Sequence, residues 1–153
     1  MPTFNDLYYT DMGNAFLKPE YAEQFNIGLK YTKNFMNMPA LRTVDASVDA
    51  YYNHITDKII AYPKGQQFRW TMLNLGEVDI KGVDIALNSA WAFGEVEATA
   101  RLQYTYQEAI DVTDSADTYY RDQIPYIPWH SGSAVLSLFY KGWGLNYSFI
   151  YTG

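Results

Sequence analysis

The sequence lacks several features that would define its class at once. None of its 153 residues is cysteine, which excludes a disulfide scaffold and a thiolate metal site. No stretch approaches the roughly 18 consecutive apolar residues that mark a transmembrane helix. Only 11 basic residues stand against 17 acidic ones, so no basic stripe is available to neutralise the phosphates of a nucleic acid. We therefore expect no nucleic-acid partner.

Catalytic and metal-binding patterns are scarce as well. The two histidines, His54 and His130, fall in different predicted strands, and no other His or Cys could complete a common metal site. No phosphate-binding Gly-rich loop and no nucleophile elbow is present. We therefore predict no catalytic residues, no metal site and no cofactor.

A run of acidic residues is the one candidate for calcium. Asp111, Asp114 and Asp117 could offer oxygens to Ca²⁺. Their spacing matches no EF-hand loop, so a solvated acidic loop is the favoured interpretation, and calcium binding stays open.

Alternation of apolar and polar residues is the dominant pattern that the sequence does contain. Within residues 22–35, Phe25, Ile27, Leu29 and Tyr31 fall on one side and polar residues on the other, which is the period of a strand with two different faces. The same pattern predicts strands over residues 41–60, 72–91, 95–112, 130–141 and from 143 onward. In the 72–91 strand the phase breaks, which indicates a bulge near Gly82 or a segment standing above a membrane.

The connections and the aromatic residues favour a membrane barrel. Short turns alternate with longer loops at residues 61–70 and 113–128, as in outer-membrane barrels. Aromatic residues, 18% of the chain with 15 tyrosines, cluster at both ends of the apolar stripes, where membrane interfaces favour them. A soluble β-sandwich or lipocalin-like barrel also alternates, but strands of roughly 12–20 residues exceed the usual length in globular sheets.

Two sequence words before the first strand carry a resemblance. PTFNDLYY at residues 2–9 and GNAFLKPE at 13–20 come in order, at a short spacing, ahead of a strand that opens near Glu23. This arrangement resembles the TonB-dependent outer-membrane receptors. The resemblance implies an all-β fold, an antiparallel meander that forms part of a transmembrane barrel in the bacterial outer membrane. It also implies uptake of a scarce ligand, with energy delivered by TonB through a plug domain that this chain does not contain.

Residues 1–153 are therefore expected to be a fragment of one barrel domain, with about six strands. Met1 is followed directly by Pro2 without a basic or apolar leader, and an outer-membrane protein needs an export signal, so we expect a longer precursor. Siderophores, cobalamin, haem and glycans are the ligand classes of the family, and the first word favours cobalamin or an iron chelate. Two alternatives stay open: a structural outer-membrane barrel, and a soluble β-barrel or β-sandwich that binds a small molecule.

The pattern assigns residues to two surfaces. The apolar stripes predict lipid-facing positions at mid-membrane: Leu29, Val48, Leu87, Leu102 and Leu138. Rigid aromatics and arginines are typical anchors of recognition sites. The two long loops therefore predict ligand contacts at the extracellular mouth: Phe68, Arg69, Trp70, Tyr119, Tyr120 and Arg121. The alternative is that these loop residues only pack the loops together.

Overall fold

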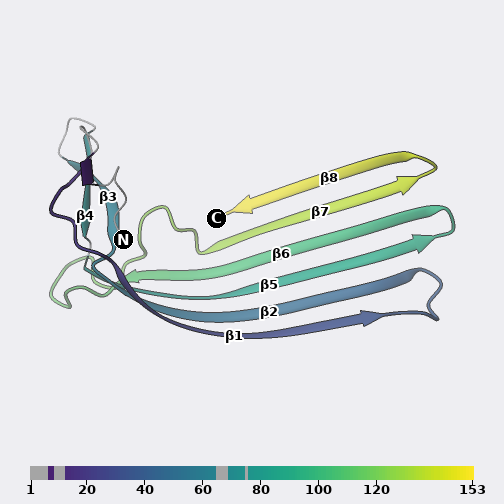
Figure 1. The fold of residues 1–153 in the computed structure, drawn as a ribbon, viewed down its shortest axis with the longest axis horizontal. Helices are drawn as coiled ribbons and strands as arrows, with labels where there is room; N and C mark the ends of the chain where they lie inside the picture. Colours follow the sequence, from purple (N-terminus) through teal and green to yellow (C-terminus); the bar gives the residue numbers. More distant parts are fainter. Residues whose placement is uncertain (1–6, 9–12, 65–68, 75) are drawn as a thin grey trace. The chain divides into compact units, whose positions relative to one another are not determined.

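All the named elements of the computed structural model are β-strands, as Figure 1 shows. The structure describes residues 7–8, 13–64, 69–74 and 76–153, and of residues 60–64, 69 and 70 it describes the backbone only. The strands are β1 (Tyr21–Asn34), β2 (Leu41–Thr56), β3 (Ile59–Lys64), β4 (Arg69–Asn74), β5 (Glu77–Phe93), β6 (Val96–Asp111), β7 (His130–Tyr140) and β8 (Trp143–Thr152). In the described residues, no helix has the length and apolar character needed to cross a membrane.

The main sheet follows the order of the chain. Six strands pair in the order β1-β2-β5-β6-β7-β8, and β3 and β4 form a separate two-stranded sheet. With that hairpin set aside, each strand neighbours the next, and β6, β7 and β8 pair antiparallel. The antiparallel meander predicted from the sequence is confirmed.

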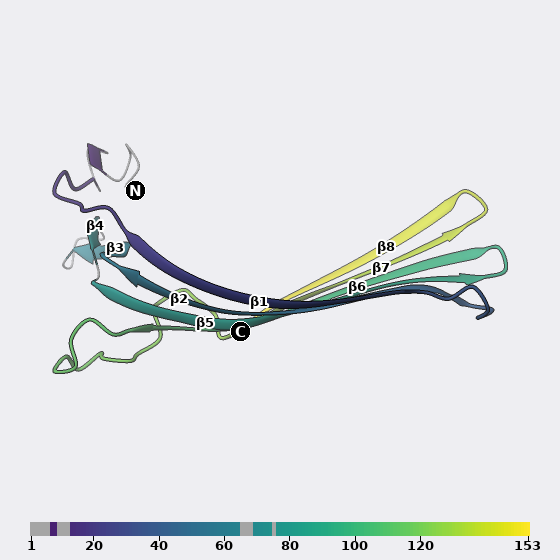
Figure 2. The same ribbon diagram turned by 60° about the horizontal axis from the view of Figure 1, so that its bottom comes forward.

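The chain divides into two compact units, which we treat separately. The loop unit comprises residues 1–25, 52–81 and 108–127. The hairpin unit comprises residues 26–51, 82–107 and 128–153. Its short turns, at residues 35–40, 94–95 and 141–142, gather at one end of the unit in both Figure 1 and Figure 2.

The strand register in the hairpin unit fixes which side chains share a face. Leu138 of β7 lies opposite Ala98 of β6 and opposite Leu145 of β8. Opposed residues project to the same side of a sheet. One apolar face therefore runs across the three strands, with these members: Ala98, Ala100, Leu102, Tyr104, Leu136, Leu138, Leu145, Tyr147 and Phe149.

The register also explains the irregular alternation in β7. Phe139 lies on the opposite, mostly polar face, where its partners are Glu97 and Gly144. A Cβ added at Gly144 would lie 3.1 Å from the Phe139 ring, so the bare glycine leaves room for that ring. The polar face thus accommodates one large apolar side chain through a local fit.

The prediction of a loop at residues 61–70 is wrong in part. β3 and β4 pair antiparallel from Ile59–Asn74 to Lys64–Arg69, so most of this region is a hairpin. The predicted strand over 41–60 ends earlier, at Thr56, and Asp57 takes a positive φ of 54° before β3 begins. Pro63 obscured the hairpin in the sequence, yet a two-stranded sheet has only edge strands, where proline is tolerated.

The strand predicted over 72–91 is likewise two strands, β4 and β5, separated at residues 75–76. β5 then continues without interruption from Glu77 to Phe93. Val78 and Ile80, which break the apolar phase, are both buried. The phase changes because this half of β5 belongs to the loop unit, which buries apolar residues in a core of its own.

Candidate functional site

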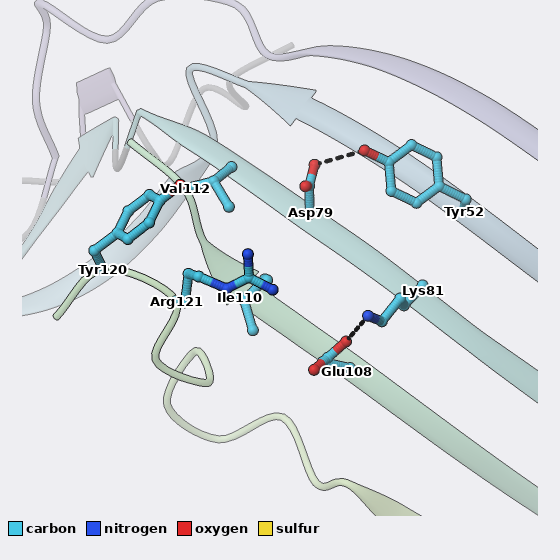
Figure 3. Close-up of a pocket in the computed structure, with 8 residues that line it drawn as sticks. All are labelled: Tyr52, Asp79, Lys81, Glu108, Ile110, Val112, Tyr120 and Arg121. Atoms are coloured by element: carbon cyan, nitrogen blue, oxygen red, sulfur yellow. Dashed lines mark hydrogen bonds and ion pairs between the residues drawn. The ribbon is translucent and has the colours of Figure 1, made fainter. Parts of the chain in front are cut away.

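The loop unit contains a cavity of about 230 Å³, which we name the charged cavity. It is lined by side chains from β2, β5, β6 and the loop after β6, as Figure 3 shows. The polar members of this lining are Tyr52, Asp79, Lys81, Glu108, Tyr120 and Arg121, and Ile110 and Val112 are the apolar ones. Two carboxylates, two cations and two phenols thus face one small space.

Cross-strand contacts fix the floor of the charged cavity. The Tyr52 hydroxyl donates to Oδ1 of Asp79 at 2.9 Å. Nδ1 of His54 lies 2.8 Å from the same oxygen. Lys81 forms an ion pair with Glu108, whose side chain is only 19% exposed. Asp79 and Lys81 are therefore held in place by partners on the neighbouring strands.

The loop after β6 brings in the remaining polar side chains. Its backbone pairs with the end of β6, where Arg121 donates to the Asp111 carbonyl at 2.7 Å and Ile124 donates to the Ala109 carbonyl at 2.8 Å. Ile124 is buried and anchors this segment. Arg121 takes a positive φ of 68°, a region that non-glycine residues occupy at a cost. Its side chain extends across the end of β6 over Ile110 (Figure 3).

The electrostatics of His54 follow from its partner. His54 lies near the end of β2, in the loop unit. The hydrogen bond to Asp79 raises the pKa of His54 above its usual 6.5, and partial burial opposes that shift. Protonated His54 is thereby favoured beside the carboxylate.

The hairpin unit contains a second, wider cavity of about 860 Å³, which we name the polar cavity. Its polar lining comes from the faces of β1, β2, β5 and β6: Lys30, Asp45, Ser47, Asp49, Asn88, Arg101 and Gln103. A Cβ added at Gly28 would collide with Oδ1 of Asp49, so the Asp49 carboxylate depends on the bare backbone there. Such a surface suits a water-filled or protein-filled interior.

The structure brings together only some of the predicted ligand contacts. Tyr120 and Arg121 both line the charged cavity, while Tyr119 is 70% exposed. Arg69 and Trp70 are the first residues of β4, and the structure describes only their backbone. Phe68 lies outside the described residues. Ligand contact by these six residues stays a prediction.

The five predicted lipid-facing residues all have exposed side chains in the hairpin unit. The exposed fractions run from 37% at Leu87 to 74% at Leu29, with Val48, Leu102 and Leu138 between them. Contact with lipid stays a prediction for each of them.

The carboxylates of the acidic loop accept hydrogen bonds from the backbone of the same loop. Oδ1 of Asp111, Asp114 and Asp117 each accepts the backbone N–H two residues later, at Thr113, Ala116 and Tyr119. These bonds are the short turns that aspartate favours. Among the described residues, no group of three His, Cys, Asp or Glu is placed to hold a metal ion.

Sequence reasoning missed the Tyr52–His54–Asp79 cluster and the Lys81–Glu108 pair. Tyr52 and His54 are two residues apart on one strand, which does signal a shared face. Their partner Asp79 is 25 residues from His54, and only the pairing of β2 with β5 reveals it.

Comparison with known proteins agrees with this architecture. The family model described as "TonB dependent receptor-like, beta-barrel" matches residues 1–153. A vitamin B12 transporter, BtuB of Vibrio vulnificus, is 36% identical over 84 residues, which cover 55% of this chain and 12% of that protein. The vitamin B12 transporter BtuB of Photobacterium profundum is 29% identical over 159 positions, 99% of this chain and 23% of that protein. The chain thus spans less than a quarter of the length of these relatives. It belongs to the TonB-dependent receptor family, as part of its β-barrel.

Proposed function

We propose that this chain is part of an outer-membrane receptor that captures a scarce small molecule and imports it with energy from TonB. The observation that supports this most is the family match over the whole chain, together with an apolar sheet face that the hairpin unit leaves exposed. A strand pair can cross a bilayer only within a closed barrel, because unpaired backbone groups in hydrocarbon cost several kcal/mol each. We infer that the missing strands and a plug domain lie in the remainder of the receptor, and that the receptor is not an enzyme.

Cobalamin is the ligand we favour. Two relatives bear the name vitamin B12 transporter, and one of them aligns with almost the whole of this chain. An iron chelate or a glycan is the second candidate, since arginine beside tyrosine also suits acidic oxygens.

The test of uptake uses the full-length receptor. Cells that express it should accumulate radiolabelled cobalamin, and accumulation should stop when TonB is deleted. A ferric siderophore, supplied separately, is the matched comparison. Uptake of the siderophore alone would identify an iron chelate, and not cobalamin, as the ligand. A correctly folded receptor in the outer membrane that takes up neither, with TonB present, would contradict the function.

Ligand contact at the extracellular mouth is a separate part of the proposal. We propose that six residues of the two long loops contact the transported ligand: Phe68, Arg69, Trp70, Tyr119, Tyr120 and Arg121. Tyr119→Ala in the full-length receptor should weaken ligand binding by about 2 kcal/mol if this residue is an anchor. Tyr126→Asn is the control, because Tyr126 is 90% exposed in the same loop and asparagine tolerates its φ of 68°. Unchanged affinity in Tyr119→Ala would move the contact to other loops or to the plug.

A further inference from the structure

Among the described residues, the charged cavity contains one cation without a carboxylate partner. Glu108 pairs with Lys81, and Asp79 accepts from Tyr52 and lies against His54. No described residue forms an ion pair or a side-chain hydrogen bond with Arg121, although its guanidinium lines the same space. A guanidinium presents a planar fork of donors that matches carboxylate or phosphate oxygens. Arg121 is therefore placed to receive an anionic group.

The other lining residues suit a group rich in hydroxyls. The carboxylates of Asp79 and Glu108 can accept hydrogen bonds, and the Lys81 ammonium and the Tyr120 phenol can donate. Ile110 and Val112 add an apolar patch for carbon-bound hydrogens. A sugar ring needs this mixture of acceptors, donors and a small apolar surface.

The volume limits the occupant to one small group. At about 230 Å³ the charged cavity is smaller than the roughly 300–1,000 Å³ typical of sites for drug-sized molecules. A single sugar ring with a phosphate fits this limit better than a whole metal chelate.

We propose that the charged cavity binds a phosphate-bearing sugar, with Arg121 as the donor to its phosphate. The sugar is either the headgroup of an outer-leaflet glycolipid or part of a soluble ligand. The proposal rests on the proposed outer-membrane receptor for the placement of the cavity. Its test measures no uptake, so failure of the site and failure of the transport function are distinguishable.

The test uses the full-length receptor folded in phosphatidylcholine vesicles. One arm titrates glucose 1-phosphate by calorimetry. The other adds lipid A to the vesicles and counts the glycolipid that stays bound to the extracted receptor by native mass spectrometry. Arg121→Gly removes the guanidinium at a φ of 68° that glycine prefers, so this variant should fold at least as well as the wild type. Arg121→Lys keeps the charge, and Arg42→Gln removes an exposed arginine that does not line the charged cavity.

We expect the wild type and Arg42→Gln to bind at least one probe alike. Arg121→Gly should bind it about tenfold or more weakly, as expected for a lost charge-assisted bond, and Arg121→Lys should fall between. Retention of lipid A that is not displaced by glucose 1-phosphate identifies the glycolipid as the occupant, and binding of glucose 1-phosphate alone identifies a soluble one. Absence of both probes from the wild type, or equal binding by Arg121→Gly, would overturn the proposal.

Discussion

The loop unit and the hairpin unit treat their apolar residues in opposite ways. The buried apolar side chains among the described residues, Leu17, Val78, Ile80, Ala109, Ile110 and Ile124, all belong to the loop unit. The hairpin unit instead exposes a continuous apolar face across β6, β7 and β8, including Leu102, Leu138 and Phe149. The loop unit has long stretches outside its strands, at residues 13–20 and 112–127, whereas the hairpin unit consists almost entirely of strands and short turns.

The difference agrees with the proposed outer-membrane barrel. A unit that buries its apolar residues under its own loops is stabilised in water by the hydrophobic effect. A sheet with a wide exposed apolar face needs a partner or a lipid, since soluble monomers rarely expose contiguous patches above a few hundred Å². The strand segments of the hairpin unit are also close to the 9–11 residues that a tilted strand needs to cross a bilayer.

The largest expected effect comes from placing a charge on the apolar face. Leu102→Arg in the full-length barrel should cost roughly 2–4 kcal/mol of folding free energy, the penalty for arginine near the bilayer midplane. Gln103→Arg is the matched control on the adjacent residue, which lines the polar cavity and should cost about 1 kcal/mol or less. Folding titrations in lipid vesicles measure both. Equal costs would contradict the assignment of the two faces.

Removing a buried side chain from the core of the loop unit should lower the folding free energy by less, and only locally. Val78 is fully buried, at 0% exposure, so Val78→Ala should cost roughly 1.5–2.5 kcal/mol through lost burial and the void left behind. Hydrogen exchange in the folded receptor should then accelerate at the ends of β5 and β6 and in the loop after β6. Exchange in residues 96–107 should stay unchanged. Acceleration spread through both units would show that they unfold together.

The sequence alone predicted the sheet well where one face is uniformly apolar. β1 and β6 begin and end within one residue of the predicted limits, and β8 begins where predicted, because alternation determines both existence and faces there. The sequence did not predict the hairpin between Ile59 and Asn74, because Pro63 and the short paired stretches of β3 and β4 hide the alternation. Of the eight residues that line the charged cavity, the sequence singled out only two. Tyr120 and Arg121 stood out as loop residues, whereas Asp79 and Glu108 join them only through the pairing of distant strands.

The His54–Asp79 contact should make the loop unit more stable at lower pH. The pKa of His54 is raised in the folded state by its hydrogen bond to Asp79. The contribution is fully present below the unfolded pKa, near 6.5, and is lost as pH rises through the raised folded value. Because 33% of the His54 side chain is exposed, solvent screening should keep the effect below that of Val78→Ala.

The measurement is the opening free energy of the loop unit from hydrogen exchange between about pH 6 and pH 8, corrected for the intrinsic exchange rate. Wild type should lose stability toward the upper end of that range, and Asp79→Asn should show a weaker dependence. A dependence of the same size in Asp79→Asn would assign it to another group.

The smallest effect should come from an ion pair in the hairpin unit, and it completes the comparison. Lys141 Nζ lies 2.8 Å from Glu95 Oε2 at the short-turn end, but the two side chains are 57% and 66% exposed. Water and salt screen such a pair, and two long side chains lose freedom to form it. The Lys81–Glu108 pair of the loop unit differs, because Glu108 is only 19% exposed and loses more when its partner is removed.

Double-mutant cycles with alanine at both pairs, at low and high salt, should give a coupling for Lys81–Glu108 that persists in salt and no measurable salt-resistant coupling for Lys141–Glu95. The reverse order would mean that burial in the loop unit does not strengthen its electrostatics, and the contrast between the units would then be limited to apolar residues.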